Sequence, residues 1–507
     1  MKKIIFGVSS LVAIVAALYL GTNMNKRTVL KVGFPVYWGN LIPSLQHTGY
    51  ADALMSNQFE ALVTSGNGGA TKPLAAKSWT VSDDFKTFTF KVDTEKMFSN
   101  GEKLTAGHFK RSWEYGLKLD PKSTNSSLQD VMYRVVGFES FKDTGALSGI
   151  TVIDDETLKI EFKEPFRMAL NHLAGSRMSA FVKDGENYLG TGPYILVDKD
   201  KTLYLSKNEY SSEEMGFDKI EISVVPPPEA SAALSSGAVD MYTFAEFTNL
   251  HECFEENENI GCYSGSEAQH RSLMLNGMEG RFFNKKEYRL AAQALVAKAL
   301  SSDKLPSYYK YNFSIDPQIY LPLQMGRLTD DSVKEIISQG EQYIGEFIEA
   351  TKLKPLYMIT SEETNWIQDI LKAQGVEFTE NSGFISTQDR VKMYYKTYEP
   401  DILVMAFSVA SGDPDGIYHA LGENGSISSP IQFRKSVSDL LENGRQILNL
   451  EKADLHYKEV AKESLREVPF VHLGFTKAIV AYRKDRVKLQ NKFKKRDDAR
   501  LSVYEAI

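Results

Sequence analysis

The chain has 507 residues, of which 42% are hydrophobic and 25% are charged, and its formal net charge is −7. These values are typical of a soluble globular protein with two or three lobes. They disfavour a nucleic-acid-binding function, because the basic side chains are scattered along an acidic chain. The eight histidines follow no metal-ligand spacing, so we expect neither a metal site nor a cofactor.

The N-terminus has the pattern of an export signal. Lys2 and Lys3 precede an apolar run over residues 4–20. This run is longer than the usual apolar part of a signal peptide and close to the shortest membrane span. The sequence therefore predicts export. It leaves two outcomes open, namely cleavage of residues 1–24 or their retention as an anchor in the inner membrane.

The first predicted elements are a strand and a helix. Residues 28–34 form a short apolar run that Pro35 ends, and residues 52–63 carry apolar side chains at helical spacing. The glycine cluster at residues 65–69 lacks the Gly-Lys-Ser/Thr sequence of a phosphate loop, so we interpret it as a turn.

Residues 72–117 contain a turn, a strand, a second turn and a helix in that order. Ser82-Asp83-Asp84 is the first turn, and residues 87–92 alternate between apolar and polar side chains, which predicts a strand buried on one face. Asn100-Gly101 is the second turn, and Thr105 can N-cap the helix that follows. The helix has one apolar stripe, made by Phe109, Trp113 and Leu117.

The rest of the chain mixes strands and helices. We predict a hairpin over 151–162, a run of strands over 190–225 and a helix over 229–240. Alternation of helix and strand then implies an α/β lobe with a partly parallel sheet. Its expected helices are 287–300, 328–350, 365–374, 436–450 and 452–467, and its expected strands are 273–276, 356–359, 376–378, 401–407, 469–475, 478–483 and 487–489.

The order of these short patterns resembles the family 5 extracellular solute-binding proteins, the dipeptide, oligopeptide and nickel receptors of ABC importers. The patterns are Trp79 with its Ser-Asp-Asp turn, the Thr-Phe-Thr-Phe strand, the Phe-Ser-x-Gly turn and the Leu-Thr-Ala helix start. Gly190-Thr-Gly-Pro-Tyr194 and the helix at 229–240 extend the resemblance. The family usually has an acidic residue after Thr-Ala. This chain has Gly107-His108 instead, which weakens the expected helix start.

The resemblance implies an α/β clamshell of the type II periplasmic-binding-protein kind, with two large lobes around a hinge and a smaller inserted lobe. The implied boundaries are residues 28–48, 186–268 and 480–507 for lobe I, 49–185 for the small lobe and 269–479 for lobe II. The two large lobes are then joined near residues 268 and 480.

The resemblance also implies a function. We expect a periplasmic monomer that captures a peptide or peptide-like solute between its lobes for the permease subunits of an ABC importer, without enzymatic activity. Two alternatives remain, a secreted hydrolase and a membrane-tethered sensor or chaperone. The chain has no Gly-x-Ser-x-Gly elbow and no His-Glu-x-x-His motif, but its many carboxylates leave the hydrolase open.

Candidate ligand-binding residues follow from the same resemblance. Tyr37 and Trp38, at the exit of the first strand, either stack on a ligand or pack beneath the next loop. Phe407 matches an aromatic position that lines the cleft, and Tyr418 is a further candidate contact.

The ligand's amino terminus is a separate question. Peptide-binding members hold it with an Asp three residues before an acidic-Pro step, which here is Asp413-Pro414, and Ala410 stands at that position. The missing carboxylate favours a solute without a free amino terminus. Asp413 or Asp415 can supply the missing carboxylate if the loop follows a different path from that of the family. Otherwise both residues shape the turn.

The chain has two cysteines, Cys253 and Cys262. In an oxidising compartment the pair can close a small loop with a disulfide, and free thiols are the alternative. A metal site is disfavoured, because two thiolates need further ligands.

Overall fold

A computed structural model describes most of the chain after the N-terminal segment. The described residues are 29–39, 41–45, 49–65, 71–119, 127–199, 202–213, 215–243, 258–301, 313–322, 324–360, 365–384, 399–408, 414–423, 435–489 and 504–506.

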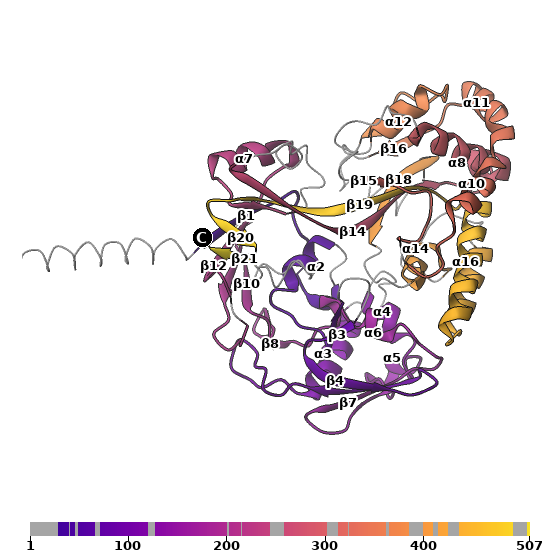
Figure 1. The fold of residues 1–507 in the computed structure, drawn as a ribbon. Helices are drawn as coiled ribbons and strands as arrows, with labels where there is room; N and C mark the ends of the chain where they lie inside the picture. The colour runs from indigo at the N-terminus through magenta and orange to yellow at the C-terminus, as the bar shows by residue number, and fades with distance from the viewer. Residues whose placement is uncertain are drawn as a thin grey trace, which may run out of the picture.

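The first half of the chain is rich in short strands (Figure 1). Its strands are β1 (Val29–Phe34), β2 (Val63–Ser65), β3 (Thr71–Pro73), β4 (Ala76–Val81), β5 (Thr87–Val92), β6 (Ile150–Val152), β7 (Thr157–Glu161), β8 (Val182–Asp184), β9 (Asn187–Leu189), β10 (Tyr194–Lys199), β11 (Thr202–Lys207), β12 (Lys219–Val224) and β13 (Met241–Tyr242). Its helices are α2 (Gly49–Met55), α3 (Ala106–Leu119), α4 (Ser127–Met132), α5 (Phe141–Thr144), α6 (Ala169–His172) and α7 (Ala230–Ser236).

The second half contains longer helices and the longest strands of the described chain. Its helices are α8 (Lys286–Leu300), α10 (Asp330–Ser338), α11 (Ile344–Leu353), α12 (Asn365–Lys372), α14 (Tyr418–Leu421), α15 (Lys435–Arg445) and α16 (Leu450–Glu467). Its strands are β14 (Ile260–Leu275), β15 (Phe313–Ile315), β16 (Met358–Thr360), β17 (Gly383–Phe384), β18 (Ile402–Ser408), β19 (Phe470–Arg483), β20 (Val487–Leu489) and β21 (Tyr504–Ala506).

One large mixed sheet runs through the upper part of the molecule in Figure 1. Its strand order is β10-β11-β12-β1-β13-β19-β14-β18-β16-β17, with β15 paired to β19. Strands β14 and β19 are 16 and 14 residues long and pair antiparallel from Ile260↔Arg483 to Met274↔Phe470. They therefore connect the strands beside β1 at one end to the strands beside β16 at the other.

The sequence underestimated both long strands. It predicted a short strand over 273–276 in place of β14, and two separate strands over 469–475 and 478–483 in place of β19. The β14–β19 backbone pairing shifts register between Ser264 and Gln269, so β14 does not keep one regular two-residue repeat along its length.

A separate four-stranded sheet, β4-β5-β7-β6, packs against α3 at the bottom of Figure 1. Phe88, Phe90 and Val92 of β5 are buried, as are Phe109 and Trp113 of α3. Both patterns predicted from the sequence are therefore confirmed. The predicted hairpin is confirmed as well, because β6 and β7 pair antiparallel.

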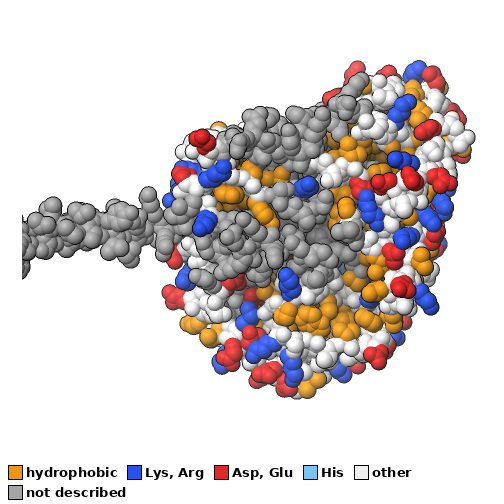
Figure 2. All heavy atoms as spheres, in the orientation of Figure 1, with side chains coloured by type: hydrophobic (Ala, Val, Ile, Leu, Met, Phe, Trp, Pro, Cys, Tyr) orange, Lys and Arg blue, Asp and Glu red, His pale blue; other side chains and the backbone are white. Residues whose placement is uncertain are grey.

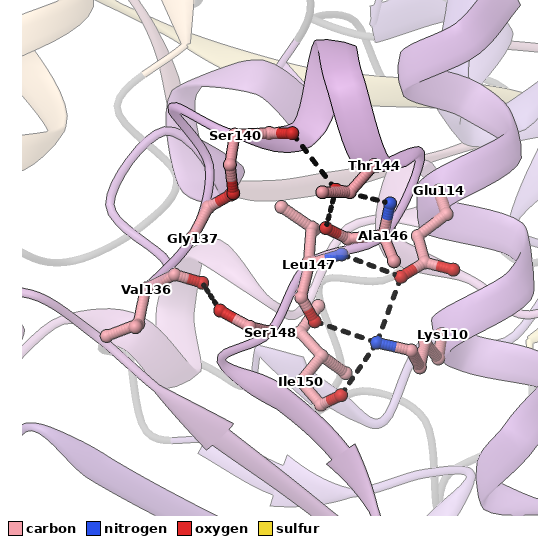
Figure 3. Close-up of polar contacts among 10 residues, drawn as sticks. All are labelled: Lys110, Glu114, Val136, Gly137, Ser140, Thr144, Ala146, Leu147, Ser148 and Ile150. Atoms are coloured by element: carbon pink, nitrogen blue, oxygen red, sulfur yellow. Dashed lines mark hydrogen bonds and ion pairs between the residues drawn. The ribbon is translucent and has the colours of Figure 1, made fainter.

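A lysine ties the loop before β6 to helix α3 (Figure 3). The ammonium group of Lys110 donates hydrogen bonds to the carbonyl oxygens of Leu147 and Ile150 at 2.7 and 2.8 Å. Its partner Glu114, 2.9 Å away, accepts a hydrogen bond from the Leu147 amide. The pair thus satisfies backbone groups of Leu147 in the short α5–β6 connection and of Ile150, the first residue of β6.

Two predicted helices differ from the structure for local reasons. The helix expected over 52–63 ends at Met55, because the Asn57 side chain donates to the carbonyl oxygens of Ala53 and Leu54 and so completes the last turn. The helix expected over 328–350 is divided into α10 and α11. Gly340 lies between them, and a Cβ there would be 2.1 Å from the Leu290 carbonyl oxygen of α8.

The Gly-Thr-Gly-Pro-Tyr segment meets the chain just after α2. The amide of Gly192 donates to the Gln58 carbonyl oxygen at 2.8 Å, and a Cβ on Gly190 would lie 2.0 Å from the same oxygen. Beside them, buried Glu60 accepts from Lys96 and from the Thr191 hydroxyl at 2.8 and 2.9 Å. The glycines of this motif are thus needed for close backbone packing.

Helix α3 begins with a side-chain hydrogen bond that the sequence analysis did not anticipate. The Thr105 amide donates to Nδ1 of His108 at 3.0 Å, so the imidazole takes the place of the acidic acceptor of a capping box. Its Nε2 lies 2.9 Å from a carboxylate oxygen of Glu102. The prediction that Gly107-His108 weakens this helix start overlooked that a neutral histidine can accept the same hydrogen bond.

We expect this cap to weaken in acid. Burial lowers the pKa of the His108 imidazole below its ordinary value, against the opposing effect of its hydrogen bond to Glu102. Because the unfolded chain then binds a proton more readily, the stabilisation is complete above the unfolded pKa of about 6.5 and is lost as pH falls below it. His108→Gln keeps a neutral acceptor. Thermal unfolding from about pH 7.5 to 5 should therefore show a smaller acid destabilisation for this variant than for the parent. Equal pH dependence of the two proteins would contradict the role of His108.

Candidate functional site

The two aromatic residues predicted at the exit of β1 have different environments. The Trp38 side chain is fully buried in a cluster with Phe34 and Leu54, and its indole N–H donates to Asp198 at 3.3 Å. Tyr37 is 51% exposed, stacks on Trp38 with ring centroids 4.9 Å apart, and donates to the same carboxylate at 3.0 Å. Of the two rings, the one with a face available to a ligand is Tyr37.

The predicted residues after β18 lie partly outside the described chain. Ala410 and Asp413 are outside the described residues. Phe407 pairs with His270 through the backbone of β18, and its side chain is likewise outside the described part. Their roles as ligand contacts stay predictions.

Asp415 and Tyr418 contact a residue that the sequence analysis did not single out, Arg445 at the end of α15. Arg445 Nε donates to Asp415 at 2.6 Å, and its guanidinium carbon lies 3.3 Å from the centre of the Tyr418 ring. The side chains of Asp415 and Arg445 are 1% and 6% exposed. The Tyr418 hydroxyl donates to Glu442, which also contacts Arg445. A buried carboxylate is thus paired with a buried cation, as such groups require.

This group of residues also meets a distant part of the chain. Arg445 Nη1 lies 3.5 Å from the Tyr133 hydroxyl, and Nε2 of His172 lies 3.9 Å from Asp415. A second arginine, Arg167, donates to the carbonyl oxygen of Ile447 at 2.5 Å. Two chain segments about 280 positions apart are therefore held in direct polar contact. A single charged residue in a helix carries no sequence signal for such a contact.

Two buried histidines lie side by side in β14 and β19. The rings of His270 and His472 are 4.7 Å apart, and the Ser272 hydroxyl lies 2.9 and 3.3 Å from their Nδ1 atoms. Burial, with a contribution from His270, lowers the pKa of His472 well below its ordinary value, so the pair suits a neutral hydrogen-bonded core. Within the described ranges, no group of three or more His, Cys, Asp or Glu side chains could hold a metal ion.

Two further sequence features concern the cysteines and the membrane. Cys262, in β14, is disulfide-bonded, whereas Cys253 is outside the described residues, so the pairing between them stays a prediction. Among the described helices, none combines the length and apolarity that a bilayer crossing needs. Residues 4–20 are not part of that description.

The face of the molecule shown in Figure 2 carries Lys and Arg side chains interspersed with Asp and Glu. On the described part of this face the basic side chains form no broad cluster.

Comparison with known proteins gives a family match over nearly half of the chain. Residues 70–311 match the model of bacterial extracellular solute-binding proteins, family 5 (middle). The chain is 25% identical over 189 residues to the dipeptide-binding protein DppE of Bacillus subtilis, a match that covers 34% of each chain. It is 29% identical over 227 residues to the nickel-binding periplasmic protein of Escherichia coli, covering 42% of this chain and 40% of that one. The chain thus matches about two fifths or less of the length of these relatives.

Solved structures extend the comparison to nearly the whole chain. The murein tripeptide binding protein MppA of Escherichia coli superposes with a TM-score of 0.78 at 16% identity, covering 95% of this chain and 99% of that one. The unliganded open form of MppA superposes less well, with a TM-score of 0.67 at 16% identity, covering 95% and 98%. The overall arrangement of the described chain is thus less similar to the unliganded open form than to the other MppA structure. The predicted α/β fold of the periplasmic-binding-protein kind is confirmed, and residues 70–311 are similar to the extracellular solute-binding proteins, family 5.

Proposed function

We propose that the protein captures a peptide or peptide-like solute between two lobes and presents it to the permease subunits of an ABC importer. The observation that carries the proposal is the β14–β19 pair, which connects two halves of the chain through one antiparallel ladder. A binding protein of this kind needs two bodies that can close on a solute, and a pair of shared strands supplies the connection.

The proposed lobes follow the boundaries expected from the sequence. Lobe I comprises residues 28–48, 186–268 and 480–507, the small lobe 49–185, and lobe II 269–479. Strands β14 and β19 both span a proposed boundary, since they cover 260–275 and 470–483. The four-stranded sheet and α3 fall wholly within the small lobe, and α8 to α16 fall within lobe II.

We propose that the ligand has no free amino terminus, because Ala410 stands where peptide-binding members have the Asp that holds it. Asp415 is the nearest described carboxylate after the predicted cleft strand β18. It is buried and already holds the Arg445 guanidinium at 2.6 Å. An ammonium group would have to compete with that pair for the same carboxylate. This favours a blocked or modified peptide, or another solute, over a peptide bound by its amino terminus.

We expect the cognate solute to stabilise the folded protein by mass action. At a free concentration 100 times its Kd, a ligand that binds only the folded state adds about 2.7 kcal/mol to the free energy of unfolding. Thermal unfolding in the presence of free peptides, N-blocked peptides and other small solutes measures this shift. Mass spectrometry of the gently purified protein identifies any solute that remains bound.

The failure of every solute class to raise the melting temperature, together with an empty purified protein, would count against the proposal. Turnover of a stabilising solute would instead favour the secreted hydrolase. The same protein and solutes serve both measurements, so binding and turnover are separated in one series.

We further propose that the protein is exported and acts as a monomer in the periplasm without enzymatic activity. The pattern of Lys2, Lys3 and residues 4–20 supports export. The intact mass of the exported protein distinguishes cleavage of residues 1–24 from their retention as an anchor. Retention of residues 1–24 would favour the alternative function, a membrane-tethered sensor or chaperone.

A further inference from the structure

Two arginines make hydrogen bonds between the small lobe and lobe II, and His172 of the small lobe also lies 3.9 Å from Asp415 of lobe II. Arg167, just before α6, donates through Nη1 to the Ile447 carbonyl oxygen in the α15–α16 connection. Arg445, at the end of α15, reaches the Tyr133 hydroxyl next to α4. We call Tyr133, Arg167, Arg445 and Ile447 the clasp. In Figure 1, α4 and α6 lie at the side of the small lobe that faces α14.

The lobe II side of the clasp is held rigidly. Arg445 is fixed from three directions, by Asp415, by Glu442 and by the face of the Tyr418 ring. A guanidinium that is already ordered loses little further side-chain freedom when it meets Tyr133. Lobe II thus presents a preformed surface to the small lobe.

The small-lobe side is also ordered. Tyr133 lies under the guanidinium of Arg134, whose carbon atom is 4.9 Å from the ring centre and 4.7 Å from that of Phe166. The Arg167 guanidinium extends over the Tyr457 ring of α16, at 5.8 Å. The contacts that cross between the lobes are those of Arg167 with Ile447 and Tyr457 and of Arg445 with Tyr133. Each joins two protein groups, so the clasp needs no solute to form.

We propose that the clasp holds the small lobe against lobe II in the absence of ligand, and that Tyr133 and Arg167 are positioning residues that set how tightly a solute is retained. The retention part of this inference rests on the proposed function, whereas the ligand-free part stands on the contacts alone. A receptor that already populates the closed arrangement loses less of its binding free energy to closure. A solute must in turn wait for the clasp to open before it leaves.

The test measures the distance between the two lobes in the ligand-free protein. Ile153, in the β6–β7 turn, and Leu353, at the end of α11, are 57% and 89% exposed, so Ile153→Cys and Leu353→Cys provide label sites on the small lobe and on lobe II. Pulsed electron spin resonance then gives the distribution of distances. We expect the short-distance population to dominate in this parent.

Arg167→Met removes the charged donor and keeps the apolar stem. We expect it to lower the ratio of short- to long-distance molecules about tenfold, because a hydrogen bond from a charged donor contributes on that scale. Tyr133→Phe removes one hydroxyl and should lower the ratio less. If Arg167→Met does not fold, Tyr133→Phe provides the test of the clasp on its own. Arg111→Met is the matched control, since Arg111 is exposed on α3 of the same lobe.

The outcomes separate the clasp from the proposed function. Identical distance distributions in Arg167→Met, Tyr133→Phe and Arg111→Met would overturn the clasp, whatever the protein binds. If a stabilising solute is found, Arg167→Met should raise its dissociation rate about tenfold with little change in the melting temperature of the free protein. A protein that binds no solute but still opens on Arg167→Met would refute the proposed function and retain the clasp.

Discussion

Gly474→Ala is expected to lower the free energy of unfolding by about 3 kcal/mol or more. Gly474 lies inside β19, between β14 and β15, with a φ of +146° that side-chain-bearing residues rarely adopt. A Cβ at this position would be 2.0 Å from the Ser314 carbonyl oxygen and 2.9 Å from the Asp316 amide. Both are backbone atoms, so relief of the clash requires the strands themselves to move.

The matched control for this variant is Gly345→Ala in α11. Nothing lies within 4 Å of a Cβ there, and the position is exposed in a helix, so alanine should stabilise the protein by about 0.5 to 1 kcal/mol. Urea or thermal unfolding measures both variants. Wild-type stability of Gly474→Ala would show that β15 and β19 can separate without cost, contrary to the packing described above.

Trp38→Ala should destabilise the protein by about 3 to 5 kcal/mol, the usual cost of removing a buried tryptophan. Its ring is fully buried, meets Phe34 edge-on at 6.5 Å and bonds to Asp198. Tyr37→Ala removes a half-exposed ring and should cost about 1 kcal/mol, chiefly the stacking on Trp38. Equilibrium unfolding of the two variants measures this difference.

Ligand binding should rank the same two variants in the opposite order. If Tyr37 contacts the solute, Tyr37→Ala weakens binding of a stabilising solute while the fold is nearly unchanged. Tyr37→Phe, which keeps the ring and loses only the hydrogen bond to Asp198, is the control. Unchanged affinity in Tyr37→Ala would remove Tyr37 from the binding site. A Trp38→Ala variant as stable as the parent would contradict the core role of Trp38.

Local patterns in the sequence were sufficient for elements whose side chains alternate or repeat regularly. Strand β5 and helix α3 were predicted correctly, because each buries one clean face in a single apolar cluster. Helix α7 also ends near the predicted position, at Gly237 in the left-handed conformation.

Features that depend on distant contacts were not predictable in this way. The end of α2 depends on where the Asn57 side chain points, and the length of β14 is hidden by its register shifts. The clasp joins Arg167 to Ile447, and neither residue type marks such a contact in a sequence. For the binding site, the sequence pointed to Asp415 and Tyr418. These two remain candidate residues, and the sequence did not reveal that Arg445 contacts both of them.

The paired course of β14 and β19 limits how the two halves of the molecule can move. The two strands are hydrogen-bonded to each other along their length, and their pairing shifts register near Ser264 and Gln269 and between Arg271 and Ser272. Because β14 and β19 are hydrogen-bonded to each other, one strand cannot bend without the other. A relative rotation of the two halves must therefore deform both strands about a common axis. Irregular pairing twists and weakens a β-ladder locally. The most easily deformed part of the β14–β19 pair is therefore expected at these register shifts. The geometry therefore favours a rocking motion of the halves and disfavours their sliding past each other.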